Sequence, residues 1–251
     1  MSKISCRSIS AACALLLAAC GSRGTPEPLA GAARIMIVHA IADTGAVDVR
    51  IATRLTPALT ALAYGAASGY QSISSGPLQL SVQPAPSVTS NSPRSLTNLN
   101  GIAAAVGSTF TFVAAGRARD TVGGNAAGIS AYTDDVSAPA SGQARLRVIN
   151  ASPDAGAVDV YATLNGGAVS GSPTFAGVDY RSALSRTLPA GSYSIKVTPL
   201  SDAATVLATT TLTLSGGGVQ TIVVRGFAGT LPAGLSSARA VAITTMVNLA
   251  P

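Results

Sequence analysis

The chain contains the same sequence block twice, and this repeat constrains its fold more than any other feature. Residues 33–49 match residues 144–160 at an offset of 111 positions, and the run Gly-Ala-Val-Asp-Val is identical in both. This period is longer than the roughly 20 to 50 residues of a solenoid repeat. Each copy therefore has to form a domain of its own, and the two domains should share one fold.

Both copies are predicted to be β-structure. Their β-branched or alternating segments are short and are separated by clusters of Gly, Pro, Asn or Asp, which is typical of strands and turns. The expected strands are 34–40, 46–52, 78–83 and 109–114 in the first copy, and 145–150, 157–163, 193–198, 205–214 and 220–225 in the second. About 100 residues with several short strands favour an antiparallel β-sandwich of immunoglobulin-like size. We therefore expect an all-β chain with two tandem β-sandwich domains.

The two sandwiches are expected at 33–136 and 144–251, with a linker at 137–143 between them. Two further connections are predicted from their composition. The Ala-rich stretch 57–68 is interpreted as a loop or a single helical turn. The glycine run at 215–218 is interpreted as a hairpin turn between 205–214 and 220–225.

The N-terminus resembles the signal of a bacterial lipoprotein. Two basic residues precede a short apolar stretch at 11–19, and Leu-Ala-Ala stands directly before Cys20. The stretch is shorter than the about 20 apolar residues of a membrane-spanning helix, which argues against an uncleaved anchor. The resemblance implies a signal peptide at 1–19, cleavage before Cys20 and a lipid on its sulfur. Because Gly21 and Ser22 follow instead of Asp, it also implies the outer membrane, on either side, with 20–32 as a flexible tether.

Composition and motifs exclude several classes of function. The formal net charge is +6, but the basic residues are scattered and not interleaved with aromatic ones, so nucleic-acid binding is not expected. No cysteine follows Cys20, which excludes a disulfide or a thiolate metal site in the mature chain. There is no Gly-x-Ser-x-Gly elbow, phosphate loop, His-x-x-x-His pair or Cys-x-x-Cys motif. We therefore expect neither an enzyme nor a cofactor.

The repeated block resembles the opening signature of a bacterial envelope family catalogued as domain of unknown function 4397. That signature is roughly Arg-x-x-His-Ala-Ser-Pro-Asp-Ala-x-x-Val-Asp-Val-Tyr, and residues 145–161 follow it closely. Its later elements, Tyr-Gly…Tyr and Pro-Ala-Gly-x-Tyr, correspond to 64–70 and 189–193. The first copy keeps His39 but lacks Ser-Pro, whereas the second keeps Ser-Pro-Asp and has Asn150 in place of His. The resemblance implies a secreted or surface-anchored β-domain, and the family has no agreed activity.

Four carboxylates of the repeated block are the best candidates for a polar site. They are Asp43, Asp48, Asp154 and Asp159. Ca²⁺ prefers several carboxylate and carbonyl oxygens, and two carboxylates per copy are too few for a convincing cage. We favour turn chemistry, in which Asp154 bonds nearby backbone N–H groups and Gly156 allows a positive φ. Asp159 is then expected to pair with Arg145 or Arg147 on a neighbouring strand.

His39 is the only histidine of the chain, and it could act as a general base or a metal ligand. The second copy has Asn150 at the equivalent position. Both side chains can donate a hydrogen bond to a turn carbonyl, so a structural role explains both copies and catalysis explains only one. The aromatic residues are spaced as core residues, although an exposed cluster of Tyr64, Tyr70 and Tyr161 could stack on sugar rings.

These observations predict a non-catalytic lipoprotein of the cell envelope that binds a glycan or a protein partner. Two alternatives stay open. One is a structural spacer without a ligand site, and the other is a hydrolase that uses His39 with Asp43 or Asp48. An exposed aromatic or polar patch shared by both copies would favour binding.

Overall fold

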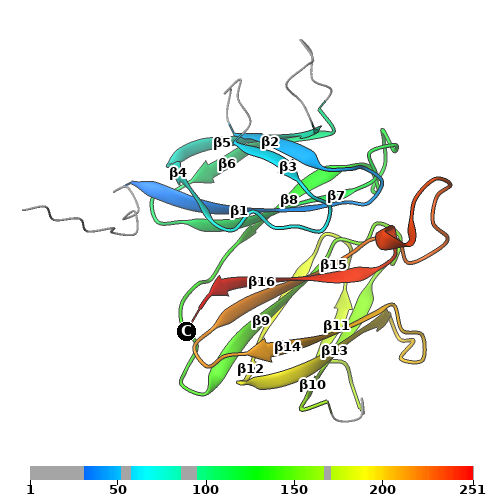
Figure 1. The fold of residues 1–251 in the computed structure, drawn as a ribbon. Coiled ribbons are helices and arrows are strands. Elements are labelled where there is room, and N and C mark those ends of the chain that lie inside the picture. Colours follow the sequence, from blue (N-terminus) through cyan, green and yellow to red (C-terminus); the bar gives the residue numbers. More distant parts are fainter. Residues whose placement is uncertain (1–30, 52–57, 86–94, 167–170, 251) are drawn as a thin grey trace, which may run out of the picture.

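The computed structural model describes residues 31–51, 58–85, 95–166 and 171–250, and Figure 1 shows them as two stacked β-sandwiches. Within these ranges the chain forms sixteen strands and one short 3₁₀ helix, Ser237–Arg239. The expected all-β class is therefore confirmed. No helix of the described ranges has the length and apolar character that a membrane crossing needs. The lipoprotein-like segment with Cys20 lies outside the described residues.

The first sandwich consists of two four-stranded sheets, in the orders β4-β1-β7-β8 and β3-β2-β5-β6. Its strands are β1 Ala32–Ile41, β2 Val47–Ile51, β3 Leu59–Leu62, β4 Gln71–Ser74, β5 Gly76–Pro84, β6 Thr97–Ala104, β7 Thr109–Gly116 and β8 Gly128–Thr133. β1 and β7 pair in parallel, and all other pairs of this sandwich are antiparallel. Alternate residues of these strands fill the space between the sheets, with Phe112 and Ile35 among the largest buried side chains.

The second sandwich repeats this topology strand for strand, in the orders β12-β9-β15-β16 and β11-β10-β13-β14. Its strands are β9 Gln143–Asn150, β10 Val158–Leu164, β11 Phe175–Val178, β12 Ala183–Pro189, β13 Gly191–Pro199, β14 Ala208–Leu214, β15 Val219–Arg225 and β16 Ala242–Leu249. β9 and β15 form the parallel pair that corresponds to β1 and β7. The repeat seen in the sequence is thus a repeat of the whole fold.

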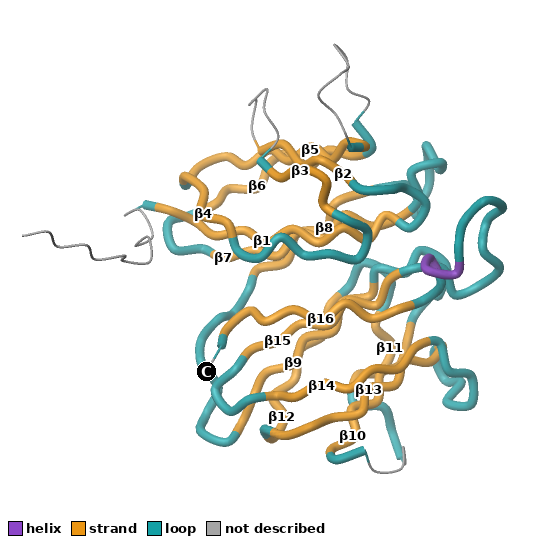
Figure 2. The backbone as a smooth tube through the Cα atoms, viewed as in Figure 1, coloured by secondary structure: helices purple, strands orange, loops and turns teal. Residues whose placement is uncertain are grey.

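The two sandwiches pack face to face through a third apolar core, which we call the seam (Figure 2). Its buried residues come from β1 and β7 on one side, and from β9 with the residue after it, β15 and β16 on the other. They are Met36, Val38, Ala40, Val113, Ala115, Ile149, Ala151, Val223 and Met246. The central strands of both facing sheets are therefore buried on both of their faces, which makes the seam continuous with the two sandwich cores.

Equivalent positions of the two sandwiches meet across the seam. Met36 pairs with Thr111 in one parallel ladder, and Arg147 pairs with Thr221 in the same place of the other. Arg147 donates hydrogen bonds to both of these threonines. The seam thus uses the same patch of both sandwiches, for example Val38 and Ile149, as the interface of a symmetric dimer does.

Two sequence expectations about connections are wrong. The glycine run at 215–218 is not a hairpin turn, because β14 and β15 belong to different sheets and the run carries the chain from one sheet to the other. There the Gly217 N–H donates to the carbonyl of Gln143 at 2.8 Å. The stretch 57–68 was expected as a loop or helical turn, yet its described part contains the short edge strand β3.

Candidate functional site

His39 closes the turn between β1 and β2. Its side chain is fully buried, and Nε2 lies 2.8 Å from the carbonyl oxygen of Gly45. The Ile41 N–H donates to Nδ1 at 3.3 Å, so the neutral ring carries its proton on Nε2. Burial is the largest cause that lowers the pKa of His39 to about 4, with further lowering by the positive charges of Arg239 and Arg225. The ring is therefore neutral at physiological pH.

Asn150 makes equivalent hydrogen bonds at the corresponding turn of the second sandwich. Its Nδ2 donates to the carbonyl of Gly156 at 2.8 Å and to that of Val178 at 3.0 Å. Its Oδ1 accepts from the Ser152 N–H at 3.1 Å. The expected hydrogen bond from both side chains to a turn carbonyl is present, and the amide and the imidazole are interchangeable for this role.

Asp43 and Asp154 join their turns to a distant loop. We expected Asp154 to bond N–H groups of its own turn, but its carboxylate accepts from Ala228 at 2.8 Å and Gly229 at 3.3 Å. Asp43 accepts in the same way from the backbone N–H groups of Ala118 at 2.5 Å and Arg119 at 3.1 Å. These amides lie more than 70 residues away in the chain, just beyond β7 and β15. The carboxylates therefore fix the end of each parallel pair, a contact that local turn rules do not reveal.

Asp48 and Asp159 face the backbone of an edge strand. Asp48 accepts from the Ala61 N–H at 2.8 Å, and Asp159 accepts from Gly177 at 2.8 Å and Ser201 at 2.9 Å. The expected pairing of Asp159 with Arg145 or Arg147 is wrong, because β9 and β10 lie in different sheets. Within the described ranges, no three His, Cys, Asp or Glu side chains gather in a way that could hold a metal ion.

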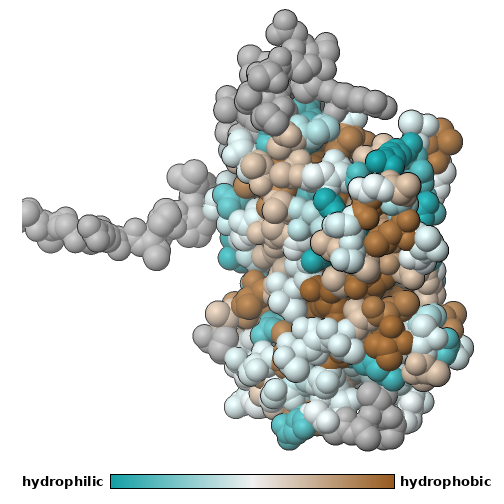
Figure 3. Space-filling model, turned by 45° about the vertical axis from the view of Figure 1, so that its right-hand side comes forward, coloured by the Kyte–Doolittle hydropathy of each residue, from teal (hydrophilic) through white to brown (hydrophobic). Residues whose placement is uncertain are grey.

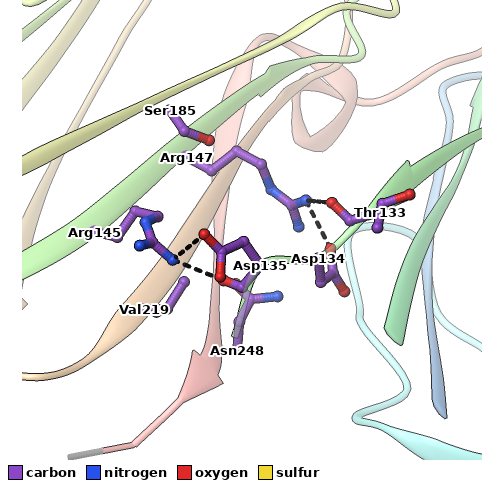
Figure 4. A pocket seen from close by; sticks show the side chains of 8 residues that line it. All are labelled: Thr133, Asp134, Asp135, Arg145, Arg147, Ser185, Val219 and Asn248. Carbon is purple, nitrogen blue, oxygen red and sulfur yellow. Dashed lines mark hydrogen bonds and ion pairs between the residues drawn. The ribbon is translucent and has the colours of Figure 1, made fainter. Parts of the chain in front are cut away.

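Both arginines pair instead with the connection that follows β8. Arg147 forms a buried ion pair with Asp134 at 2.6 Å, and Arg145 pairs with the more exposed Asp135 at 2.8 Å (Figure 4). The Tyr70 hydroxyl donates to Asp134 at 2.6 Å and accepts from Asn248 at 2.8 Å. Burial raises the pKa of Tyr70 to about 12, so this hydroxyl keeps its proton. Asp134 and Asp135, which lie just before the predicted linker 137–143, are therefore part of the interface.

A small pocket opens beside this network (Figure 4). It is lined by Thr133, Asp134, Asp135, Arg145, Arg147, Ser185, Val219 and Asn248, and its volume is about 80 Å³. Pockets for metabolite-sized ligands have roughly 300 to 1,000 Å³. The pocket is thus large enough for a few water molecules, and its charged side chains are already paired with one another.

A cationic cluster lies at the end of the seam that adjoins the two turns, and we call it the junction. Its members are Tyr64, Arg117, Arg181, Arg225 and Arg239. Arg225 and Arg239 both place their guanidinium groups over the Tyr64 ring, at 4.6 and 4.0 Å from its centroid. The ring of His39 meets the edge of Tyr64 at 5.8 Å between centroids. Arg117, in the loop after β7, reaches Asp154 in the turn after β9 at 3.7 Å and so links the two sandwiches.

Sequence reasoning missed the junction. We expected Tyr64, Tyr70 and Tyr161 as core residues or as an exposed cluster, but the first two lie at the seam and Tyr161 is buried beneath Lys196. The second copy also has a counterpart of the Tyr64-Gly65 pair, because Gly65 and Arg181 donate equivalent backbone hydrogen bonds at 2.7 Å to His39 and Asn150. Both residues have a positive φ. The change from Gly to Arg concealed this correspondence.

The chain was compared with known families, curated proteins and solved structures. A family described as "Domain of unknown function (DUF4397)" matches residues 33–161, which comprise the first sandwich and the opening block of the second. No curated protein matches. Among solved structures, the chain is similar to the Bacillus anthracis TIE protein at 12% identity and a TM-score of 0.26. That match covers 78% of this chain and 33% of the other, so the chain spans about a third of that protein.

Proposed function

The chain belongs to the DUF4397 family, and on that premise we propose that it is a non-catalytic binding module of the bacterial cell envelope. The proposed ligand is a glycan. The proposed binding surface is the outer face of the sheet β11-β10-β13-β14, which points away from the seam. The observation that carries this proposal is the composition of that face, which consists mainly of uncharged hydroxyl side chains.

The hydroxyls stand in regular rows. Along β14, Thr209, Thr211 and Thr213 are exposed, whereas the residues between them pack towards the core. Thr211 lies beside Ser194 of β13, and Thr213 lies beside Ser192. Figure 3 shows the second sandwich, in its lower part, covered largely by pale side chains of intermediate hydropathy. A flat array of hydrogen-bonding groups without net charge matches the hydroxyl-rich surface of a sugar chain, and sugars need no deep cavity for such contacts.

The first sandwich has a related face on β5 and β6. Leu78, Leu80 and Val82 point into its core, so the residues between them point outward. There Ser81 lies beside the exposed Asn98. Uncharged polar side chains thus occur on the outer sheet of both copies, and a shared polar patch of this kind favours binding over a passive spacer.

The geometry gives no support to the alternative of a hydrolase that uses His39. The imidazole is buried, both of its nitrogens are hydrogen-bonded, and its neighbours Asp43 and Asp48 accept from backbone N–H groups. A general base needs to be within hydrogen-bond reach of its substrate. The proposal also includes a lipid anchor on Cys20, which rests on the sequence before that residue.

The spacer alternative has one observation in its favour. The residues of the family signature form hydrogen bonds that stabilise turns and strand ends, which is a structural role. A spacer would have the same seam and turns but no ligand, so ligand binding itself distinguishes the two.

Thermal melting against a panel of glycans tests the proposal. The panel includes peptidoglycan fragments, with Ca²⁺ and Zn²⁺ added separately. A ligand at 100 times its dissociation constant adds about 2.7 kcal/mol to the stability. For a chain of this size that corresponds to a rise of several degrees in Tm. We expect a glycan, and neither cation, to raise Tm.

A pair of variants locates the binding surface. Thr211→Val removes one exposed hydroxyl and keeps the shape of the side chain, while Thr210→Val makes the same change on the opposite face of β14. We expect Thr211→Val to reduce the glycan-induced shift and Thr210→Val to leave it intact. If no glycan raises Tm, the glycan proposal is wrong, and cross-linking in the intact envelope would decide between a protein partner and a spacer.

A further inference from the structure

Two of the junction arginines have neither a carboxylate nor a carbonyl partner among the described residues. Arg225 donates one hydrogen bond, from Nε to the hydroxyl of Thr244 at 2.7 Å, and Arg239 is held by its stack on Tyr64. Among the described residues, neither guanidinium group has a carboxylate within 4.0 Å. Two cations that share one aromatic ring repel each other, so the ring stack alone leaves their charge uncompensated.

The same place contains three polar atoms that are shielded from solvent and have no hydrogen-bond partner among the described residues. They are Tyr64 Oη, Arg225 Nη1 and Arg239 Nη1. Shielded polar atoms in folded proteins nearly always have a partner, and each exception calls for an explanation such as a bound ion. Here the three unpaired atoms belong to Tyr64 and to the two arginines stacked on its ring, and all three can donate a hydrogen bond.

Arg117 and Arg181 also have one shielded nitrogen without a partner, Nε in both, but other atoms of their guanidinium groups do have acceptors. Arg181 donates to the carbonyl oxygens of Ala115 and Ala126, at 3.3 and 2.6 Å. Arg117 pairs with Asp154 and Asp120. The guanidinium groups of Arg117 and Arg181, which join the two sandwiches, thus have carbonyl or carboxylate partners. Those of Arg225 and Arg239 have neither.

The backbone leaves room for this arrangement. A Cβ atom on Gly65 would lie 2.5 Å from the Arg225 guanidinium group, so only glycine lets Arg225 rest against the chain beside Tyr64. Tyr64, Arg225 and Arg239 are all partly exposed as whole residues, so this group of side chains borders solvent. The two sandwiches contribute different parts, with the ring from the first and both cations from the second.

We propose that Tyr64, Arg225 and Arg239 form a binding site for a phosphate-class oxyanion at the junction. Guanidinium groups are suited to phosphate oxygens, which they bind through charge-assisted hydrogen bonds. Three donors on three side chains match a tetrahedral anion, which offers an oxygen to each of them, better than a carboxylate, which has two oxygens. The anion is either free phosphate or a phosphate group carried by an envelope lipid or polymer. The site is independent of the glycan surface, which lies on the outer sheet of the second sandwich.

The single histidine is a built-in reporter for this site. Arg225 and Arg239 lower the pKa of His39, whose ring contacts Tyr64, so an anion bound between them counteracts that lowering. Nuclear magnetic resonance of the imidazole gives one set of signals, because the chain has one histidine. We expect inorganic phosphate, added at constant ionic strength, to shift these signals in a saturable way and to raise the pKa of His39.

Calorimetric titration of the purified protein with inorganic phosphate gives the affinity. A charge-assisted hydrogen bond contributes enough that its loss weakens binding about 10-fold or more, which is the effect expected for Arg239→Gln. Tyr64→Phe keeps the ring and removes only the hydroxyl, and it should weaken binding by a smaller factor. Arg186→Gln is the matched control, because it removes one exposed positive charge from β12, away from the junction, and should leave binding unchanged.

Three results would overturn the proposal. They are the absence of saturable binding, equal weakening by Arg239→Gln and Arg186→Gln, and unchanged binding in both Arg239→Gln and Tyr64→Phe. A comparison of inorganic phosphate with a phosphate monoester and a phosphodiester distinguishes the sources. A preference for free phosphate identifies a solute site, whereas tighter binding of the esters identifies a lipid or polymer group.

Discussion

Replacement of His39 with asparagine should remove a pH dependence from the stability of the protein. The pKa of His39 is lowered from 6.5 to about 4 in the folded chain, chiefly by burial. The unfolded chain therefore binds more protons than the folded one between these two values, and stability falls as the pH decreases from 6.5 towards 4. Above pH 6.5 the imidazole is neutral in both states, and the effect disappears.

The magnitude follows from the shift. Each pKa unit corresponds to about 1.4 kcal/mol, so the full loss is about 3 kcal/mol and the loss at pH 5 is about 2 kcal/mol. Asparagine is the appropriate replacement because Asn150 already makes the equivalent bonds to Gly156 and Ser152 in the second sandwich. Asn does not titrate, and its smaller volume adds a cost that is the same at every pH.

Urea unfolding at pH 7.5 and pH 5 measures the effect, because few carboxylates titrate in this range. The parent protein should lose about 2 kcal/mol between the two conditions, whereas His39→Asn should lose much less. The reasoning is refuted if the variant shows the same loss as the parent, or if the parent shows none.

Three further predictions concern the fold and the anchor. Gly116→Ala should destabilise the protein by about 1 to 3 kcal/mol in urea unfolding. Gly116 has a φ of +106°, and a Cβ there would lie 2.5 Å from the Ala126 carbonyl oxygen. The control is Gly45→Ala, whose Cβ meets no atom within 4 Å and which should change the free energy of unfolding little. Asp134→Ala should cost about 3 kcal/mol or more by the same assay, since Arg147 would stay buried without its counter-charge, and a loss below 1 kcal/mol would show that the pair does not hold the seam. Cys20→Ser should release the protein from membranes or leave its signal uncleaved, and continued incorporation of labelled lipid would contradict the assignment of the anchor.

The interior strands could be predicted from the sequence because each carries a strong local pattern. All nine expected strands occur, among them β1, β10 and β13, with ends that differ by a few residues. The missed strands are mostly edge strands such as β4, β11 and β12, which are short or exposed and lack a clear alternation. They form because an interior strand beside them offers unpaired backbone groups, and for β4 and β12 that neighbour is not the preceding strand in the chain.

The seam could have been predicted from an uninterrupted apolar run in the sequence, but strand prediction from alternating apolar and polar residues does not use such a run. Positions 35–38 of β1 are apolar without interruption, and an unbroken apolar run is typical of a strand that is buried on both faces. The partners of Asp43, Asp154 and Arg147 had no such signal, because they lie beyond distant strands of the same sandwich or in the other sandwich. Such contacts depend on how sheets stack, which residue spacing does not specify.

The claim on which the whole account depends is that the two sandwiches form one body through the seam. Differential scanning calorimetry of the purified protein tests it most directly. We predict a single transition whose van't Hoff enthalpy equals the calorimetric enthalpy, because the apolar seam and the Arg147–Asp134 pair couple the two cores. Two resolved transitions would contradict this prediction, since they would mean that each sandwich unfolds on its own and that the junction has no fixed geometry.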